Sequence, residues 1–357
     1  MPTRPRTTEP GTRTVPQALR PGDRVAVAAP AGPPDPELLD RGTALLESWG
    51  LEVTVLPHVR DTHLGHLAGR DADRAADLTA ACADPGVRAV FCARGGYGTQ
   101  RMVDLVDWPR LAAAPPALLI GSSDVTALHE AFAVRLATTT LHAPMPATGA
   151  ITANPTSAAH LRTVLFEPER VTGLPLTGPQ LVPGTARGRI AGGNASLLAA
   201  SVGTPTAFPP DGCLLLLEEV GEEPYRLDRI LTQLLRAGVL HRAAAFVLGD
   251  FTDCGPPHEV EALLADRLGG LGVPVACGLP AGHGPLQLTV PLGVRAELAA
   301  GSLTLLEPPL AARTAGGAPG GRPASGVQAA AERSKAADHG TAAGREPAGR
   351  TAAGRGG

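Results

Sequence analysis

Between residues 23 and 136, short apolar segments alternate with amphipathic ones, and this alternation restricts the possible folds more than any other feature. The segments DRVAVAAP, LEVTVLP, VRAVFCAR and ALLIGS have the length of strands and are near-continuous in apolar residues. The segments PELLDRGTALLESWG, DADRAADLTAACAD, QRMVDLVD and DVTALHEAFAVRL read as helices. Apolar strands separated by helices predict a parallel α/β sheet covered on both faces. Ligands bind at the carboxyl ends of the strands in such sheets.

The sequence predicts two folded domains and two disordered ends. An N-terminal α/β domain spans 19–145, and a connection rich in Pro, Thr and Gly spans 146–186. Short apolar runs with two helical segments (194–203 and 225–238) predict a smaller β-rich domain over 187–312. Residues 1–18 and 313–357 are expected to be disordered, because the tail is a Gly, Ala, Arg and Pro mixture with few large apolar residues to offset its ordering entropy.

Composition excludes several classes of function. The net charge of −3 provides no basic field for nucleic acid, and the tail has no aromatic residue to stack on a base. No apolar run approaches the ~18 residues of a membrane helix, and no apolar segment follows the basic N-terminus as in a secretory signal. We therefore expect a cytoplasmic protein with neither a nucleic-acid nor a membrane partner.

Cofactor and metal chemistry find little support. The only lysine, Lys335, lies in the tail, so the folded part has no candidate for a Schiff base, and the P-loop pattern is absent. The five cysteines are scattered without a CxxC pair, which favours small core residues over a disulfide framework or a zinc site. His63 and His66 form an HLGH string without further ligands. We expect no cofactor and no metal.

The stretch GSSD at 121–124 joins a predicted strand to a predicted helix and has two interpretations. Ser122, Ser123 or Asp124 could cap the helix by accepting a backbone N–H bond, which the local sequence favours. Alternatively, a tight turn exposes a nucleophilic serine, and the helix N-terminus stabilises an oxyanion. The string lacks the second glycine of GxSxG, so it is not the α/β-hydrolase elbow.

Other segments carry residues that could assist such a serine. His283 lies between Gly282 and Gly284, which allow an unusual backbone path, whereas His129 lies too far round the helix after GSSD to serve Ser123. Glu218 and Glu219 end an apolar run, where either could form an ion pair with Arg226 or Arg229 or orient a histidine. In RGGYG at 94–98, Gly95 and Gly96 could direct N–H groups at an anion, and Arg94 could bind a carboxylate or belong to an ion pair in the sheet.

Together and in order, six strings resemble the LD-carboxypeptidase family of serine peptidases. They are RDADRAADLTAACADPGVRAVFCARGGYG (70–98), GSSDVTALH (121–129), GGNASLLAASVGTP (192–205), LLLEEVGEEPYRLDRILTQLLRAG (215–238), GDFTDC (249–254) and GLPAGHGPLQLTVPLGVRAEL (278–298). The resemblance covers about 23–308. It implies a Rossmann-like or flavodoxin-like N-terminal domain joined to a small β-rich domain, with the active site between them.

The resemblance also implies a reaction and its residues. Ser123 would be the nucleophile, His283 the general base and acid, and Glu218 the group that orients the histidine. Backbone N–H groups of Asp124 and of Gly95 or Gly96 would form the oxyanion hole. The substrate would be a murein tetrapeptide that loses its C-terminal D-Ala during cell-wall recycling, and the enzyme would be a homodimer. Ser122 departs from the family, in which an aromatic residue usually precedes the nucleophile.

Two other functions stay open. Relatives that resemble the microcin C immunity peptidase cleave peptidyl or aminoacyl nucleotides, although EEVGEEPYRLDR looks closer to the cell-wall branch. The third hypothesis is a non-catalytic binding module in which Ser123 merely caps its helix. A covalent adduct with a serine-reactive probe would distinguish an enzyme from the binding module, because a capping serine lacks an activating base.

Overall fold

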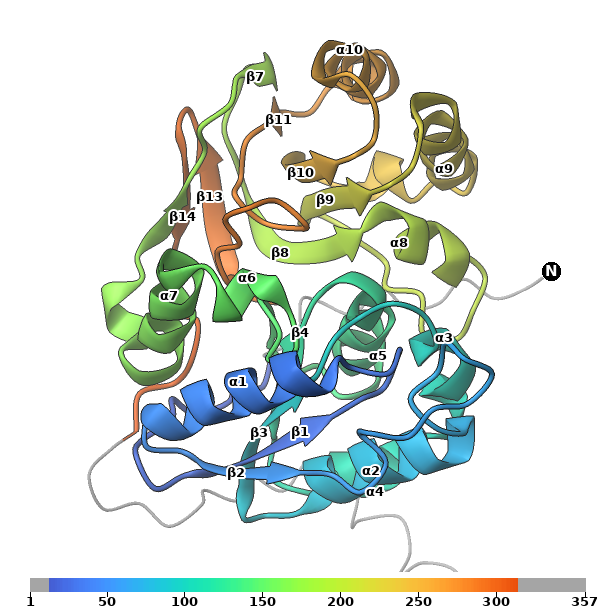
Figure 1. The fold of residues 1–357 in the computed structure, drawn as a ribbon. Coiled ribbons are helices and arrows are strands. Elements are labelled where there is room, and N and C mark those ends of the chain that lie inside the picture. Colours follow the sequence, from blue (N-terminus) through green and yellow to red (C-terminus); the bar gives the residue numbers. More distant parts are fainter. Residues whose placement is uncertain (1–12, 314–357) are drawn as a thin grey trace, which may run out of the picture. The chain divides into compact units, whose positions relative to one another are not determined.

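The first sheet is built from the alternating segments (Figure 1). The computed structural model describes residues 13–313. The strand order is β12-β5-β4-β3-β1-β2, parallel throughout except for β12, which pairs antiparallel with β5. The strands are β1 (Arg24–Ala28), β2 (Glu52–Val55), β3 (Val87–Cys92), β4 (Leu118–Gly121), β5 (Thr140–His142) and β12 (Val290–Leu292). The order 2-1-3-4-5 is that of flavodoxin-like sheets, so the predicted α/β class is confirmed.

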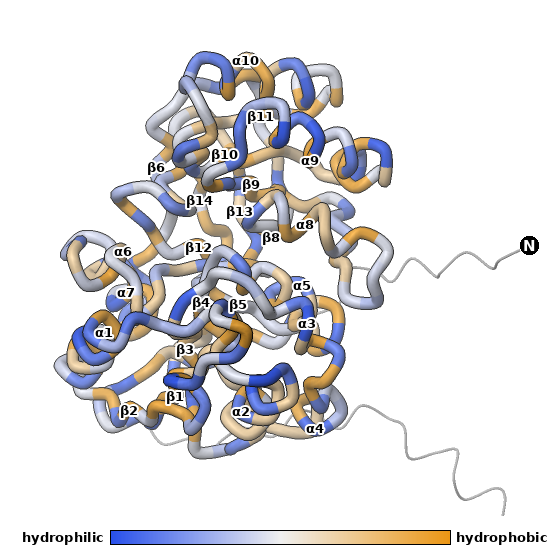
Figure 2. The backbone as a smooth tube through the Cα atoms, turned by 45° about the vertical axis from the view of Figure 1, so that its right-hand side comes forward, coloured by the Kyte–Doolittle hydropathy of each residue, from blue (hydrophilic) through white to orange (hydrophobic). Residues whose placement is uncertain are grey.

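Helices cover both faces of this sheet because alternate residues of its apolar strands point in opposite directions. Val27 packs in one cluster with Leu39 of α1 and Leu161 of α7, whereas Ala26 packs in another with Leu78 of α2 and Leu128 of α5. Figure 2 shows hydrophobic and hydrophilic stretches alternating along these helices, as expected when each buries one side. The helices of this part are α1 (Pro36–Ser48), α2 (Asp71–Ala83), α3 (Thr99–Met102), α4 (Trp108–Ala113), α5 (Thr126–Arg135), α6 (Gly149–Thr152) and α7 (Pro155–Phe166).

The second sheet has eight strands in the order β6-β14-β13-β8-β9-β10-β11-β7, with parallel pairing from β8 to β11. Its strands are β6 (Gly173–Pro175), β7 (Gln180–Val182), β8 (Ala186–Asn194), β9 (Leu214–Val220), β10 (Ala245–Thr252), β11 (Val275–Ala276), β13 (Arg295–Ala299) and β14 (Ser302–Leu305). Its helices are α8 (Ala195–Ser201), α9 (Pro224–Arg236) and α10 (Pro257–Leu268). Leu215 and Leu217 of β9 pack with these helices in a third cluster.

Short 3₁₀ turns connect several of these elements. They are η1 (Val103–Leu105), η2 (Ser123–Val125), η3 (Pro168–Arg170), η4 (Leu240–Arg242) and η5 (Gly269–Leu271). Within residues 13–313, no helix combines the length and the apolar character needed to cross a membrane. All five cysteines are free thiols. The same residues contain no group of three or more His, Cys, Asp or Glu side chains that could hold a metal ion.

Some segments differ from the pattern read from the sequence. The run 288–293, assigned to the second domain, contributes β12 to the first sheet. The predicted connection, 146–186, carries α6, α7, β6 and β7, and α10 lies where no helix was predicted. In the predicted disordered N-terminus, Thr14 bridges Thr138 and Gln17 bridges Ala311, whereas residues 1–12 and 314–357 lie outside the described residues. The domain boundary within 146–186 therefore stays a proposal.

Candidate active site

The turn after β4 places Ser123 in a backbone conformation that L-residues seldom adopt. The strand ends at Gly121, Ser122 stays extended, and Ser123 has a φ of +61° at the start of η2. A left-handed non-glycine residue costs of order 1–3 kcal/mol, and such residues cluster at active sites. Neither the start of η2 nor that of α5 has a side-chain cap bond, so the simple capping interpretation finds no support here.

Ser123 begins a chain of hydrogen bonds that crosses between the two halves of the sequence. Its Oγ lies 3.0 Å from Nε2 of His283, which is 160 residues away in the chain. Nδ1 of the same imidazole lies 2.8 Å from Oε2 of Glu218. The geometry is that of a nucleophile, a base and an orienting carboxylate. Ser122 is buried beside them, but His283 bonds to the neighbouring hydroxyl of Ser123.

The two glutamates at the end of β9 have different partners because successive strand residues point to opposite faces. Glu218 lies on the same face of β9 as Leu216, and its side chain reaches His283. Glu219 points the other way, where it accepts bonds from Nδ2 of Asn194 and from the backbone N–H of Ser196, both at 2.8 Å. Glu219 thus ties β9 to the start of α8. The structure leaves only Glu218 in contact with the histidine.

Burial and pairing set the charges in this chain of bonds. Burial lowers the pKa of His283, but the hydrogen bond and negative charge of Glu218, together with the charges of Glu219 and Asp250, outweigh it, so that the net pKa lies above the ordinary value. Burial raises the pKa of Glu218, and the bond to His283 opposes that rise. Glu218 is fully buried, whereas 27% of the His283 side chain is exposed. The imidazole can therefore exchange protons with a molecule in the adjoining pocket, while the carboxylate cannot.

Asp250, in the second half of β10, lies next to the site and was not anticipated from the sequence. Its Oδ2 accepts the backbone N–H of Gly284 at 3.2 Å, next to His283. Burial, together with the charge of Glu218, raises the pKa of Asp250 to about 6, against the opposing effect of the Gly284 bond. A Cβ at Gly282 would lie 2.7 Å from Oε2 of Glu218, so the loop needs glycine there. The signal in the sequence was available, because Asp250 follows an apolar strand as Glu218 does.

The glycine turn after β3 lies directly against the serine. A Cβ at Gly95 would lie 2.7 Å from Cβ and 2.9 Å from Oγ of Ser123. Asp124 joins this turn to the serine turn, because its buried Oδ2 accepts the N–H of Thr99 at 2.8 Å. The carboxylate of Asp124 therefore holds the glycine turn rather than capping its own helix.

We expect Gly95→Ala to lower kcat/KM by about 10²-fold or more, because the added methyl group must displace the Ser123 side chain and small misplacements are costly. Peptide hydrolysis and the rate of labelling by a serine-reactive probe would measure the effect. Gly149→Ala is the matched control, since Gly149 lines the same pocket and its Cβ would meet nothing within 4 Å. Equal activity in the two variants would contradict close packing at Gly95.

A pocket of about 550 Å³ opens beside Ser123 and His283. Arg94 lines it, donates to the backbone oxygens of Gly95 and Pro33, and forms no ion pair within residues 13–313. Gln287 lines it too and was not anticipated from the sequence; it is 3% exposed, and its Nε2 has no hydrogen-bond partner among the described residues. The pocket thus presents the guanidinium of Arg94, and the unpaired amide of Gln287 lies buried in its wall.

His129 is excluded from this chemistry, as the helical spacing predicts. It is buried, with its ring nitrogens 2.9 Å from Oγ1 of Thr140 and from the carbonyl of Gly121. Burial lowers the pKa of His129 to about 4, so the imidazole stays neutral at physiological pH. Its role is to brace the serine turn against β5.

Comparison with protein families agrees with this arrangement of two halves. Residues 25–143 match the family model for the LD-carboxypeptidase N-terminal domain, and residues 187–298 match the model for the C-terminal domain. The chain belongs to the LD-carboxypeptidase family. As a member, it is a serine carboxypeptidase and a hydrolase. The resemblance predicted from six strings is confirmed.

Two relatives show how far the likeness extends. One relative is a Streptomyces coelicolor protein that is named provisionally as a carboxypeptidase. It is 54% identical over 300 residues, which cover 83% of this chain and 97% of the relative. The murein tetrapeptide carboxypeptidase of Pseudomonas aeruginosa is 35% identical over 288 residues, which cover 77% of this chain and 92% of the relative. Both matches therefore extend over nearly the full length of the relative.

Solved structures share the fold. The muramoyltetrapeptide carboxypeptidase of Oxalobacter formigenes superposes with a TM-score of 0.69 at 29% identity, over 79% of this chain and 97% of that one. MccF in complex with glutamyl sulfamoyl guanosine gives a TM-score of 0.75 at 19% identity, over 83% and 99%. The second likeness concerns the fold alone.

Proposed function

We propose that this protein removes the C-terminal D-alanine from murein tetrapeptides, using Ser123 as nucleophile, His283 as general base and acid, and Glu218 to orient the histidine. The observation that carries the proposal is the continuous chain of bonds from Ser123 Oγ through His283 to the buried Glu218. The name of the Pseudomonas aeruginosa relative supports the substrate class. Recovery of cell-wall peptides in the cytoplasm is the setting that we propose for the reaction.

In the proposed mechanism, Ser123 Oγ attacks the carbonyl of the amide between an L-centre and D-alanine, and His283 Nε2 takes the hydroxyl proton. The tetrahedral oxyanion is stabilised by the N–H of Asp124 and that of Gly95 or Gly96, each worth roughly 3 kcal/mol. His283 then donates its proton to the alanine nitrogen, which leaves. Water, deprotonated by His283, hydrolyses the acyl-enzyme and releases the tripeptide. Glu218 holds the imidazole in the reactive tautomer and stabilises its cation throughout.

The test is mass spectrometry of the purified full chain with a diaminopimelate tetrapeptide that ends in D-alanine. We expect loss of one alanine from the tetrapeptide and no cleavage of aminoacyl sulfamoyl-adenosine. The opposite pattern, cleavage of aminoacyl sulfamoyl-adenosine and not of the tetrapeptide, would assign the protein to the second candidate activity. The nucleotide conjugate in the MccF complex is the reason for testing that compound. Cleavage of neither compound, with no covalent adduct from a serine-reactive probe, would leave a binding module. Light scattering on the same sample tests the proposed homodimer.

The carboxypeptidase specificity requires recognition of a free C-terminal carboxylate, and we propose that Arg94 and Gln287 provide it. Arg94→Met and Gln287→Leu should each raise KM for the tetrapeptide by roughly 10- to 100-fold, because a charge-assisted bond is lost, with a smaller change in kcat. Hydrolysis of the C-terminal amide of the same peptide should be little affected by either variant. An unchanged preference for the free acid over the amide would contradict the assignment.

The pH profile follows from the raised pKa of His283. The base must be neutral to accept the serine proton, so kcat/KM should rise with pH through an acid limb centred above 6.5, the ordinary histidine value. Asp250→Asn should move that limb to lower pH, because the negative charge of Asp250 raises the pKa of His283. Rates measured from pH 5 to 9 for both proteins would check this. A limb that stays in place in Asp250→Asn would show that the two groups are not coupled.

A further inference from the structure

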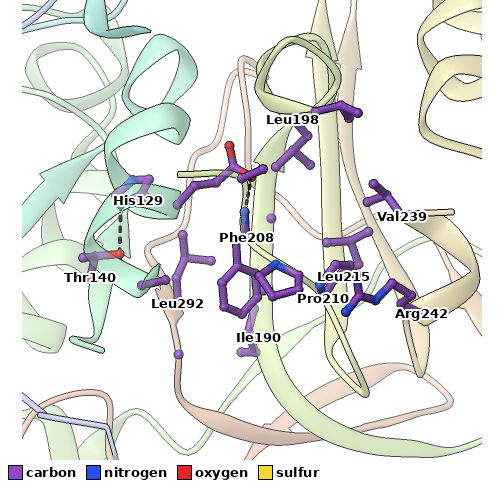
Figure 3. Close-up of a pocket in the computed structure, with 18 of the residues that line it drawn as sticks. His129, Thr140, Ile190, Leu198, Phe208, Pro210, Leu215, Val239, Arg242 and Leu292 are labelled. Carbon is purple, nitrogen blue, oxygen red and sulfur yellow. Dashed lines mark hydrogen bonds between the residues drawn. The ribbon is translucent and has the colours of Figure 1, made fainter. Parts of the chain in front are cut away.

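A second cavity, of about 270 Å³, lies on a different set of elements from the catalytic pocket. Its walls come from α5, from the segment before β5, from β8 and β9, and from the loops after α8 and α9 (Figure 3). The apolar lining includes Ile190, Leu198, Leu215, Val239 and Leu292, which Figure 3 shows in one group with Phe208. The cavity shares no lining residue with the pocket that holds Ser123. It is smaller than the ~300–1,000 Å³ of typical drug-sized sites, which suits a molecule of amino-acid size.

One wall carries a buried carboxyl group with an unused oxygen. Glu130 on α5 is 6% exposed, and its Oε1 accepts the backbone N–H of Phe208 at 3.1 Å. Its Oε2 has no partner at hydrogen-bond geometry among the described residues, although the side chain of Ser201 lies near enough to the carboxyl group to act on it. Burial raises the pKa of Glu130 to about 7, against the opposing effects of Ser201 and Phe208. A buried acceptor without a partner costs stability, so a donor from a ligand would be favourable here.

Another wall carries a guanidinium without a carboxylate. Arg13 lies over the ring of Phe208, 5.2 Å from the ring centre, and forms no ion pair within residues 13–313. The remaining polar groups have protein partners: Arg242 pairs with Asp211, and Thr140 bonds to His129. Glu130 and Arg13 are therefore the ionisable groups that the cavity leaves for a ligand.

We propose that this cavity binds an α-amino acid with an apolar side chain. Its ammonium group donates to Oε2 of Glu130, its carboxylate pairs with Arg13, and its side chain packs among Ile190, Leu198 and Leu215. The opposite charges of an amino acid match the two unpartnered groups, and the apolar lining matches its side chain. The proposal does not depend on the peptidase reaction.

The cavity is bordered by the structural elements that carry or adjoin the proposed catalytic residues Ser123 and Glu218. Glu130 and Ser123 lie on one continuous stretch formed by η2 and α5. Ile190 lies on β8, which pairs with β9 up to Glu218. Asn194, at the end of β8, donates its backbone N–H to Oγ1 of Thr126 on α5, at 3.0 Å. A ligand that packs between α5 and β8 therefore contacts the two elements that connect to the nucleophile and the acid.

The experiment is calorimetric titration of the full chain with three probes that share one apolar body: L-leucine, 3-methylbutylamine and 4-methylpentanoate. L-leucine should bind at least about tenfold more tightly than either probe that lacks one charged group. Glu130→Gln should weaken L-leucine by about tenfold or more and leave 4-methylpentanoate unchanged. Glu37→Gln, at an exposed glutamate on α1, is the matched control and should bind all three like the wild type.

Two further variants locate the binding. Ala133→Phe, one turn after Glu130 on α5 and on the cavity wall, should abolish binding by filling the space. Arg94→Met, in the catalytic pocket, should leave L-leucine affinity unchanged. Loss of binding in Arg94→Met but not in Glu130→Gln would place the amino acid in the catalytic pocket and overturn the proposal. Affinity weaker than about 10 mM for every probe would overturn it as well.

Discussion

Ser123→Ala should lower kcat/KM for the tetrapeptide by about 10⁵-fold or more, since loss of the nucleophile removes the covalent route and leaves only binding and oxyanion stabilisation. The physical reason is local: Ser123 Oγ is the hydroxyl bonded to the base, at 3.0 Å from His283 Nε2. Chromatographic measurement of released alanine under single-turnover conditions would cover this range. The variant should also lose all labelling by a serine-reactive probe.

Ser122→Ala is the matched control for that variant. Ser122 is buried immediately before the nucleophile and lines the same pocket, but its φ of −151° keeps it in the extended conformation of the preceding strand. We expect its activity to stay within a few-fold of the wild type. The reverse result, an inactive Ser122→Ala and an active Ser123→Ala, would transfer the nucleophile to Ser122 and refute the geometry described above.

Glu218→Gln should lower kcat by roughly 10⁴-fold while the fold is retained, because an amide at this position favours the wrong imidazole tautomer and cannot stabilise its cation. The bond in question joins Glu218 Oε2 to His283 Nδ1 at 2.8 Å. The variant should also move the acid limb of kcat/KM to lower pH, since the carboxylate is what raises the pKa of His283 against burial. Steady-state rates from pH 5 to 9 would record both effects.

Glu219→Gln separates catalysis from stability at the neighbouring position. The two carboxylate oxygens of Glu219 accept hydrogen bonds from the backbone N–H of Ser196 and from the side-chain amide of Asn194. In Glu219→Gln, an NH₂ group replaces one of these oxygens and faces one of the two donors without an acceptor. We expect a loss of about 1–3 kcal/mol in the free energy of unfolding. The kcat of the folded fraction should stay close to that of the wild type. A catalytic defect in Glu219→Gln as large as that in Glu218→Gln would mean that the role of the orienting acid is shared.

The sequence predicted β1 to β4 of the first sheet because they are short, largely apolar runs between amphipathic segments, but it did not predict β5 or β12. It predicted the second half less completely. The helix α10 has buried residues at helical spacing, Val260, Leu264 and Leu268, but they lie in a charged segment that reads as a loop. The strand β12 is three residues long and finds its partner, β5, nearly 150 residues earlier in the chain. Pairing over such a separation leaves no local periodicity to read.

The sequence by itself determined which residue types stand at the ends of strands: serine and aspartate after β4, glycines after β3, two glutamates at the end of β9, and the glycine-flanked His283. It left open which serine and which glutamate contact the histidine. Tertiary structure decided both, through backbone directions that composition does not encode. The positive φ of Ser123 turns its hydroxyl toward His283, and the alternation of side chains along β9 sends Glu218 to the imidazole and Glu219 to α8. The cavity beside Glu130 depends on the tertiary fold for the same reason, because its walls come from segments that only the packing of α5 against β8 brings together.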